Sequence, residues 1–128
     1  MMRFGCQDMV TQVRRILLKH PRDAFINQAT IDFQSSELNY SNTPDFEIAC
    51  KDYDQFLDLI RSFGPEIHFL PASNTSLDSI YTHDPCIVTN RGAILCNMGK
   101  PQRSKEPDKI EKYFTSIGVS ILGRIEGT

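Results

Sequence analysis

Two carboxylates, an aromatic ring and an arginine lie near one another in the sequence, between Asp78 and Arg103. Asp78 and Asp84 lie on either side of Tyr81, and Arg103 follows in a basic loop. Paired carboxylates hold a planar guanidinium through charge-assisted hydrogen bonds. Tyr81 offers a ring face or a phenol, and Arg103 offers a fork of donors for a carboxylate. These residue types suit a ligand that is cationic at one end and anionic at the other.

The stretch after Asp84 has the pattern of a hairpin followed by a helix and a strand. Residues 86–89 and 93–96 are short apolar runs, and the glycine at the end of the turn Asn90–Gly92 suits positive φ. The helix is expected over Lys105–Ile117, with Ser104 as its N-cap. Its apolar face repeats at helical spacing. That face consists of Ile110, Tyr113, Phe114 and Ile117.

The first half of the chain predicts the same order of elements with a longer connection. A strand is expected over Arg15–Lys19, and His20 at its end reads as structural or solvated. The polar segment 22–42 is either a lid over a site or a loop held by its few apolar residues. A helix is expected from Pro44, capped by Thr43. Its predicted buried face consists of Phe46, Ala49, Tyr53, Phe56, Leu57, Ile60 and Phe63, and a strand over residues 67–70 follows.

A weak internal repeat links the two halves. The run Ser62–Ile67 resembles Ser116–Ile121, and in both a glycine separates a helix from a strand. Each half therefore reads as strand, loop, helix, glycine and strand.

The spacing Asp-x-x-aromatic-x-x-Asp, a hairpin and then Gly-x-Pro-x-Arg resembles the first half of the guanidine-modifying superfamily. This superfamily includes arginine deiminases, dimethylarginine dimethylaminohydrolases and amidinotransferases, which share the pentein fold. The resemblance implies an α/β fold that is a partial pentein-type propeller of about two strand-helix-strand modules. We expect a single domain over residues 1–128, with modules at about 13–71 and 78–128.

The resemblance also implies a function and a binding site. The chain is expected to be the N-terminal, substrate-binding portion of an enzyme that acts on arginine-type guanidino compounds. Asp78 and Asp84 match carboxylates that bind the guanidinium or amino groups, Tyr81 matches the aromatic position, and Arg103 matches a residue that pairs with the substrate carboxylate. The family's catalytic acid, histidine and cysteine lie beyond Thr128, so no catalytic residue is assigned and the chain is expected to be inactive alone. The alternative is a non-catalytic binding or assembly module.

The composition of the chain limits the classes of partner that it is expected to bind. A formal net charge of −2 does not favour nucleic acid, and no apolar run approaches membrane-spanning length. The four cysteines have no Cys-x-x-Cys spacing and are expected to be free thiols in a cytoplasmic protein. The histidines and cysteines also lack zinc-site spacing, and no cofactor is expected.

Two further expectations concern reactivity and assembly. His83 and Cys86 could form a reactive pair, but packing of Cys86 in the hairpin is the preferred interpretation. Two modules of a closed propeller would leave apolar sides open, so a homo-oligomer, or association with a missing C-terminal half, is predicted.

Overall fold

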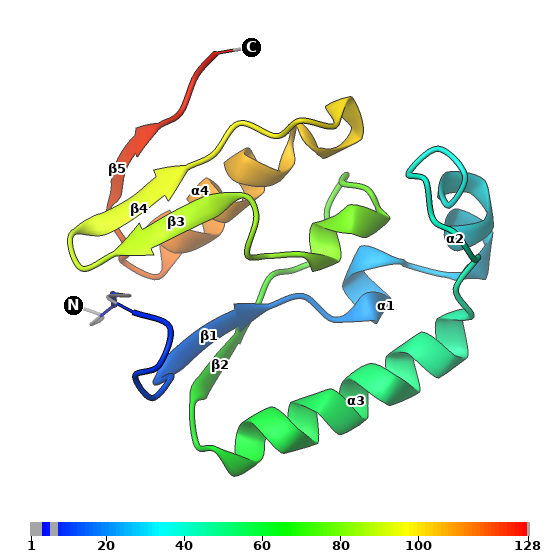
Figure 1. Ribbon diagram of the computed structural model, residues 1–128, viewed down its shortest axis with the longest axis horizontal. Coiled ribbons are helices and arrows are strands. Elements are labelled where there is room, and N and C mark those ends of the chain that lie inside the picture. The colour runs from blue at the N-terminus through cyan, green and yellow to red at the C-terminus, as the bar shows by residue number, and fades with distance from the viewer. Residues whose placement is uncertain (1–3, 6–7, 128) are drawn as a thin grey trace. The chain divides into compact units, whose positions relative to one another are not determined.

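The computed structural model describes residues 4–5 and 8–127, which form a mixed α/β structure with two compact units (Figure 1). The first unit is Arg14–Tyr81, and the second comprises the described residues of Met1–Val13 and Thr82–Thr128. Cys6, which the sequence predicts to be a free thiol, lies outside the described residues.

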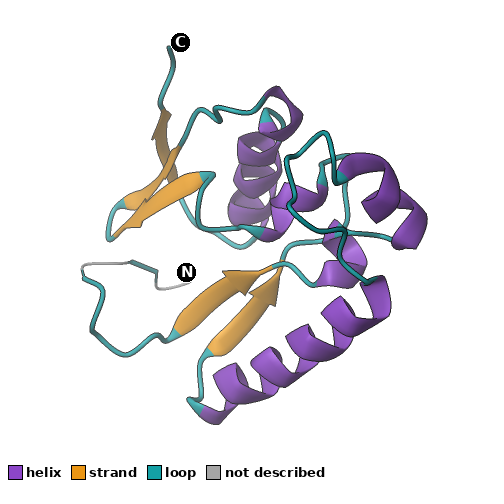
Figure 2. Ribbon diagram, turned by 45° about the vertical axis from the view of Figure 1, so that its right-hand side comes forward, coloured by secondary structure: helices purple, strands orange, loops and turns teal. Residues whose placement is uncertain are grey.

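The first unit is built on a parallel pair of strands joined through a long helix. Strand β1 (Arg15–Leu18) pairs with β2 (Glu66–Phe69), with Arg15 opposite Glu66 and Leu18 opposite Phe69. Between them come the short helices α1 (Pro21–Ala24) and α2 (Gln28–Gln34) and the 17-residue helix α3 (Phe46–Ser62), which is the longest helix in Figure 2. The short helix η1 (Leu77–Ile80), a 3-10 helix, follows β2.

The core of this unit is built largely by the long connection between β1 and α3. Phe25, Ile31 and Leu38 are buried there against Leu77 of η1, and Ala24 completes the cluster. Phe46 and Ala49 of α3 pack against this cluster. The connection is therefore a structural part of the first unit, held by its isolated apolar side chains.

The second unit repeats the parallel strand-helix-strand pattern and adds a hairpin. Strands β3 (Cys86–Thr89) and β4 (Gly92–Leu95) are antiparallel, and β4 is parallel to β5 (Ile121–Arg124). Between β4 and β5 come the 3-10 helix η2 (Pro101–Arg103) and helix α4 (Glu106–Ser116), which contacts β5. The buried face of α4 contains Ile110 and Phe114, as its spacing predicts.

The repeat seen in the sequence has a common backbone cause. Gly64 after α3 has φ +81°, and Gly118 after α4 has φ +86°. Glycine adopts this left-handed conformation without the steric cost of a Cβ atom, and it reverses the chain after a helix. Both glycines therefore direct the chain from a helix into a strand parallel to the strand before that helix.

The predicted start of α3 was wrong. The helix begins at Phe46 instead of Pro44, and its N-cap is Asp45, whose side chain accepts a hydrogen bond from the Ile48 backbone N–H at 2.9 Å. Gln28 explains the shift, because its amide group donates to the Pro44 carbonyl and accepts from the Phe46 N–H. This tertiary contact outweighs the local preference for Thr43 as the cap.

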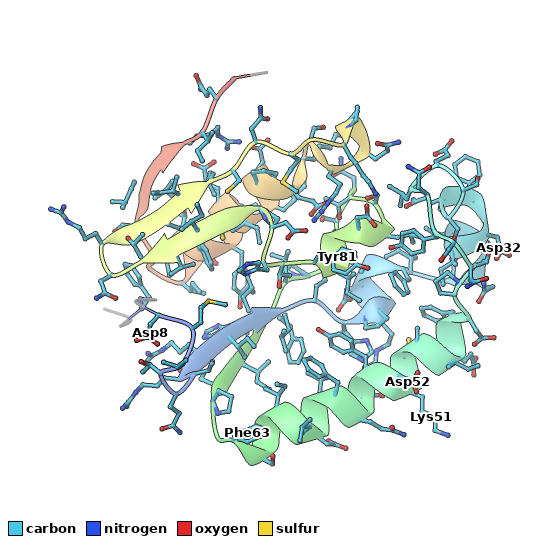
Figure 3. All side chains as sticks on the ribbon, viewed as in Figure 1. Asp8, Asp32, Lys51, Asp52, Phe63 and Tyr81 are labelled. Atoms are coloured by element: carbon cyan, nitrogen blue, oxygen red, sulfur yellow. The ribbon has the colours of Figure 1, made fainter. Side chains whose placement is uncertain are left out.

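The predicted cap of α4 and part of the predicted buried face of α3 were also wrong. Ser104 does not cap α4, because it closes η2 with a backbone hydrogen bond to Pro101, and α4 begins at Glu106. Phe56 on α3 and Phe63 directly after it are 40% and 65% exposed, whereas Leu57 is 3% exposed. Figure 3 shows Phe63 at the C-terminal end of α3, where the helix passes into the chain that leads to β2.

No helix among the described residues is long and apolar enough to cross a membrane.

A pair of leucines on α3 tests the orientation of this helix. Leu57→Ala should lower the free energy of unfolding by about 2–5 kcal/mol, because it leaves a cavity under a buried side chain. Leu59→Ala is the matched control, since Leu59 is 57% exposed and its truncation should cost less than about 0.5 kcal/mol. Urea unfolding followed by circular dichroism measures both values. Equal costs would contradict the observed burial of α3.

Candidate functional site

Asp78 is a buried carboxylate on the 3-10 helix η1. Leu77 beside it is fully buried in the core of the first unit, which fixes the helix and leaves Asp78 only 3% exposed. The Asp78 Oδ1 accepts a hydrogen bond from the Tyr40 hydroxyl at 2.9 Å. Because a buried charge is costly unless it is hydrogen-bonded, this contact stabilises the carboxylate in place.

Tyr40 comes from the long connection between β1 and α3 and was not predicted as a site residue. Asn39 before it has φ +63°, and the Tyr40 N–H donates to the Ser35 carbonyl, so the chain turns back toward η1. Burial raises the pKa of the Tyr40 phenol, and the hydrogen bond to Asp78 raises it further. Tyr40 is therefore a protonated donor across the ordinary pH range.

Tyr81 lies at the C-terminal end of η1, where its backbone N–H donates to the Asp78 carbonyl at 3.0 Å (Figure 3). Its side chain is 54% exposed, unlike Asp78. The Tyr81 phenol also contributes to the raised pKa of Tyr40, so these two aromatic residues interact. η1 thus presents a partly exposed ring next to a held carboxylate.

Arg103 forms the centre of a charged cluster in the second unit. Its Nε and Nη2 donate to Glu106 Oε2 and Oε1, each at 2.8 Å, and its Nη1 donates to Asp84 Oδ2 at 2.8 Å. Arg103 is 9% exposed and Glu106 is 3% exposed, whereas the Asp84 side chain is 46% exposed. The two-point contact with Glu106 is the geometry that makes arginine–carboxylate pairs strong and directional.

Two opposing effects act on the pKa of Arg103 in this cluster. Burial by itself would lower the pKa of Arg103, but its hydrogen bonds to Glu106 and Asp84 outweigh burial and raise the pKa. Arg103 therefore stays charged although it is buried. Glu106 was missed by the sequence interpretation, although its position three residues after Arg103 suits such a pair.

The structure places the four predicted site residues in two groups. Asp78 on η1 and Tyr81 directly after it belong to the first unit, whereas Asp84 and Arg103 form an ion pair in the second. The sequence had placed Asp84 and Arg103 at opposite ends of a ligand, but here they contact each other. Their roles toward a ligand remain predictions.

His20 has a structural role at the end of β1. Its Nδ1 accepts from the Arg22 N–H and caps α1, and its Nε2 lies 2.8 Å from Asp54 Oδ1. The side chain is 5% exposed, and its ring contacts Tyr53 edge to face. Within residues 4–5 and 8–127, no group of three histidine, cysteine or acidic side chains could hold a metal ion.

A comparison with protein families identifies the fold and its relatives. Residues 20–125 match the family model described as N,N dimethylarginine dimethylhydrolase, eukaryotic. The chain belongs to the dimethylarginine dimethylaminohydrolase family. The resemblance predicted from the Asp78–Asp84 spacing is thereby confirmed, and so is the partial pentein fold.

Relatives of known sequence and structure agree with this assignment. The dimethylarginine dimethylaminohydrolase of Pseudomonas aeruginosa is 25% identical over 113 residues, which are 88% of this chain and 42% of that protein. A serine-for-cysteine variant of the Pseudomonas aeruginosa enzyme, in complex with citrulline, is similar in structure, with a TM-score of 0.69 and 22% identity over 91% of this chain and 43% of that one. A glycine-for-histidine variant of a dimethylarginine dimethylaminohydrolase, as an adduct with S-methyl-L-thiocitrulline, gives a TM-score of 0.70 and 23% identity over 90% and 42%. The chain thus spans less than half the length of these relatives.

Cys86 provides a test of the reactive-pair hypothesis. Its thiol is buried, and burial raises its pKa to about 11, whereas His83 is exposed. Few thiolates form at pH 8, so iodoacetamide should modify Cys86 in the folded chain far more slowly than in urea. Peptide mass spectrometry after timed quenching measures both rates. Rapid modification at pH 8 with a midpoint below pH 9 would support an activated Cys86.

The contact between Tyr40 and Asp78 can be tested by stability. Tyr40→Phe removes a donor from a buried carboxylate and should cost about 1–3 kcal/mol. In an Asp78→Asn background the same change should cost less, because the charged acceptor is gone. Urea unfolding of the four proteins gives the coupling. An equal cost in both backgrounds would show that Tyr40 stabilises the chain only by packing.

Proposed function

We propose that this chain is the N-terminal, substrate-binding portion of an enzyme of this family that acts on arginine-type guanidino compounds. The observation that supports the proposal best is that each predicted carboxylate has a dedicated donor. Asp78 is held by Tyr40, and Asp84 is held by Arg103. Carboxylates whose positions are fixed before binding lose little conformational entropy when they bind a planar cation.

The proposed roles follow from the chemistry of the side chains. Asp78 and Asp84 accept N–H groups from the guanidinium or amino groups of the ligand. The exposed ring of Tyr81 offers a face for a cation. Arg103 adds positive charge near Asp84 for the carboxylate of the ligand. The complex of a relative with citrulline supports a ligand of this class.

The chain is proposed to bind such ligands without converting them. Attack on a guanidinium carbon needs a nucleophile and a proton shuttle. The thiol of Cys86 is unsuited to this role because its pKa is raised to about 11. The chain spans less than half the length of its relatives, and we propose that the residues that do the chemistry lie in the part of the fold that it does not span.

Ligand titration tests the proposal directly. Arginine should bind with an affinity in the millimolar range, about 4 kcal/mol, because the chain supplies only part of a site. NMR titration should shift signals of Tyr81 and its neighbours, and Asp84→Asn should weaken binding severalfold. Citrulline and amine release, followed in the same samples, should stay at background. Glu111→Gln on the exposed face of α4 is the control variant.

Two outcomes would contradict the proposal. Turnover that disappears in Cys86→Ser would make the chain an enzyme by itself. Absence of any arginine-dependent shift up to tens of millimolar would favour the alternative function, a non-catalytic assembly module.

A further inference from the structure

Helix α3 has a second apolar surface on the side roughly opposite its buried face. Ile48, Phe56 and Leu59 are 40–59% exposed, and Phe63, the helical C-cap residue that follows α3, is 65% exposed. At 100° per residue these four positions fall within a sector about 80° wide, whereas the buried Leu57 lies on the other side. Single exposed apolar side chains are common, but a contiguous stripe of them marks an interaction surface. We call these four residues the α3 stripe.

A row of charged residues with alternating sign runs along α3 beside the α3 stripe. The row consists of Glu47, Lys51, Asp58 and Arg61, which are all exposed. Figure 3 shows Lys51 projecting from α3 away from β1 and β2. When the helix is reversed, the order of signs is reversed as well. A second copy of α3 that runs antiparallel therefore meets each charge of the row with the opposite charge.

The spacing of the charged row selects one register for such a pair. If the two helices are centred between positions 54 and 55, Glu47 faces Arg61 of the second copy, and Lys51 faces Asp58. Two-fold symmetry repeats both pairs, and it brings each flank of α3 against the same flank of the second copy. The α3 stripes then meet each other next to the charged pairs. Charged residues that flank an apolar seam select the partner and the orientation in helix pairs.

Two further acids of α3 lie outside these pairs. Asp54 lies near the centre of the row, and its Oδ1 is 2.8 Å from His20 Nε2, so it is held by its own chain. Asp52 lies one turn from both Ile48 and Phe56, within the α3 stripe. No opposite charge of the row faces Asp52 in this register, so its carboxylate should weaken the pairing.

We propose that the α3 stripe and the charged row beside it bind the same face of a second copy of this chain, in an antiparallel, two-fold symmetric dimer. The proposal assigns a surface to the homo-oligomer that the sequence predicts, and it does not depend on the proposed binding of guanidino compounds. One helix from each copy makes a small interface, so we expect a dimer with a Kd in the micromolar range.

Analytical ultracentrifugation across a dilution series tests the surface. Leu59→Ser should raise the dimer Kd at least about tenfold, because it removes an apolar contact from both copies. Leu122→Ser on β5 is the matched control, since Leu122 is 51% exposed and the chemical change is the same. This control should leave the Kd unchanged, and Asp52→Asn should lower it. Loss of association in Leu122→Ser but not in Leu59→Ser would move the interface to β5 and overturn the proposal.

Charge reversal tests the register. Lys51→Glu and Asp58→Lys each place like charges opposite one another at two symmetric positions, so each should raise the Kd about three- to tenfold. The double variant, and an equimolar mixture of the two single variants, should restore a Kd near that of the unmodified chain. Positions 51 and 58 are two helical turns apart and do not face each other within one chain, so this recovery arises only between copies.

The remaining outcomes contradict the proposal. A double variant that associates as weakly as the single ones would exclude the antiparallel register. An unmodified chain that stays monomeric at hundreds of micromolar would exclude the dimer. Urea unfolding below the dimer Kd checks that each variant folds. If Leu59→Ser does not fold, Leu59→Ala carries the same expectation.

Discussion

A buried charge in a small α/β unit must have a hydrogen-bond partner of its own, and both units of this chain meet that constraint beside a short 3-10 helix. At η1 the carboxylate of Asp78 accepts a hydrogen bond from the phenol of Tyr40. At η2 the guanidinium of Arg103 donates two hydrogen bonds to Glu106 and one to Asp84. Asp78, Arg103 and Glu106 are buried, so these hydrogen bonds orient the polar groups toward one another.

The two clusters differ in the sequence separation between the charged residue and the residue that holds it in place. Glu106 is three residues from Arg103, so the turn from η2 into α4 is enough to join them. Tyr40 is 38 residues from Asp78 and reaches it only because Phe25, Ile31 and Leu38 pack the long connection against Leu77. The connection thus has a structural role in holding a site residue.

The assignment to the dimethylarginine dimethylaminohydrolase family gives these clusters a functional context. Charged groups that are oriented before binding lose less freedom when a ligand arrives, which favours recognition of a small planar cation. Asp84 combines this property with exposure, since it is held on one side and 46% exposed. Asp78 is nearly fully buried, so the binding role proposed for it requires a ligand that approaches η1 closely.

The sequence by itself determined the family, the order of the strands and of the two longer helices, and the two strand-helix-strand repeats. These features depend on local patterns: the Asp78–Asp84 spacing, the apolar face of α4, and the glycines at 64 and 118 that end helices with positive φ. Only the tertiary structure decided that Asp45 caps α3, that Phe56 and Phe63 are exposed, and that Tyr40 holds Asp78. It also decided that Arg103 pairs with Asp84 and Glu106. Each of these outcomes depends on which side chains meet in space, and a one-dimensional pattern does not contain the hydrogen-bond geometry or the desolvation that selects one partner over another.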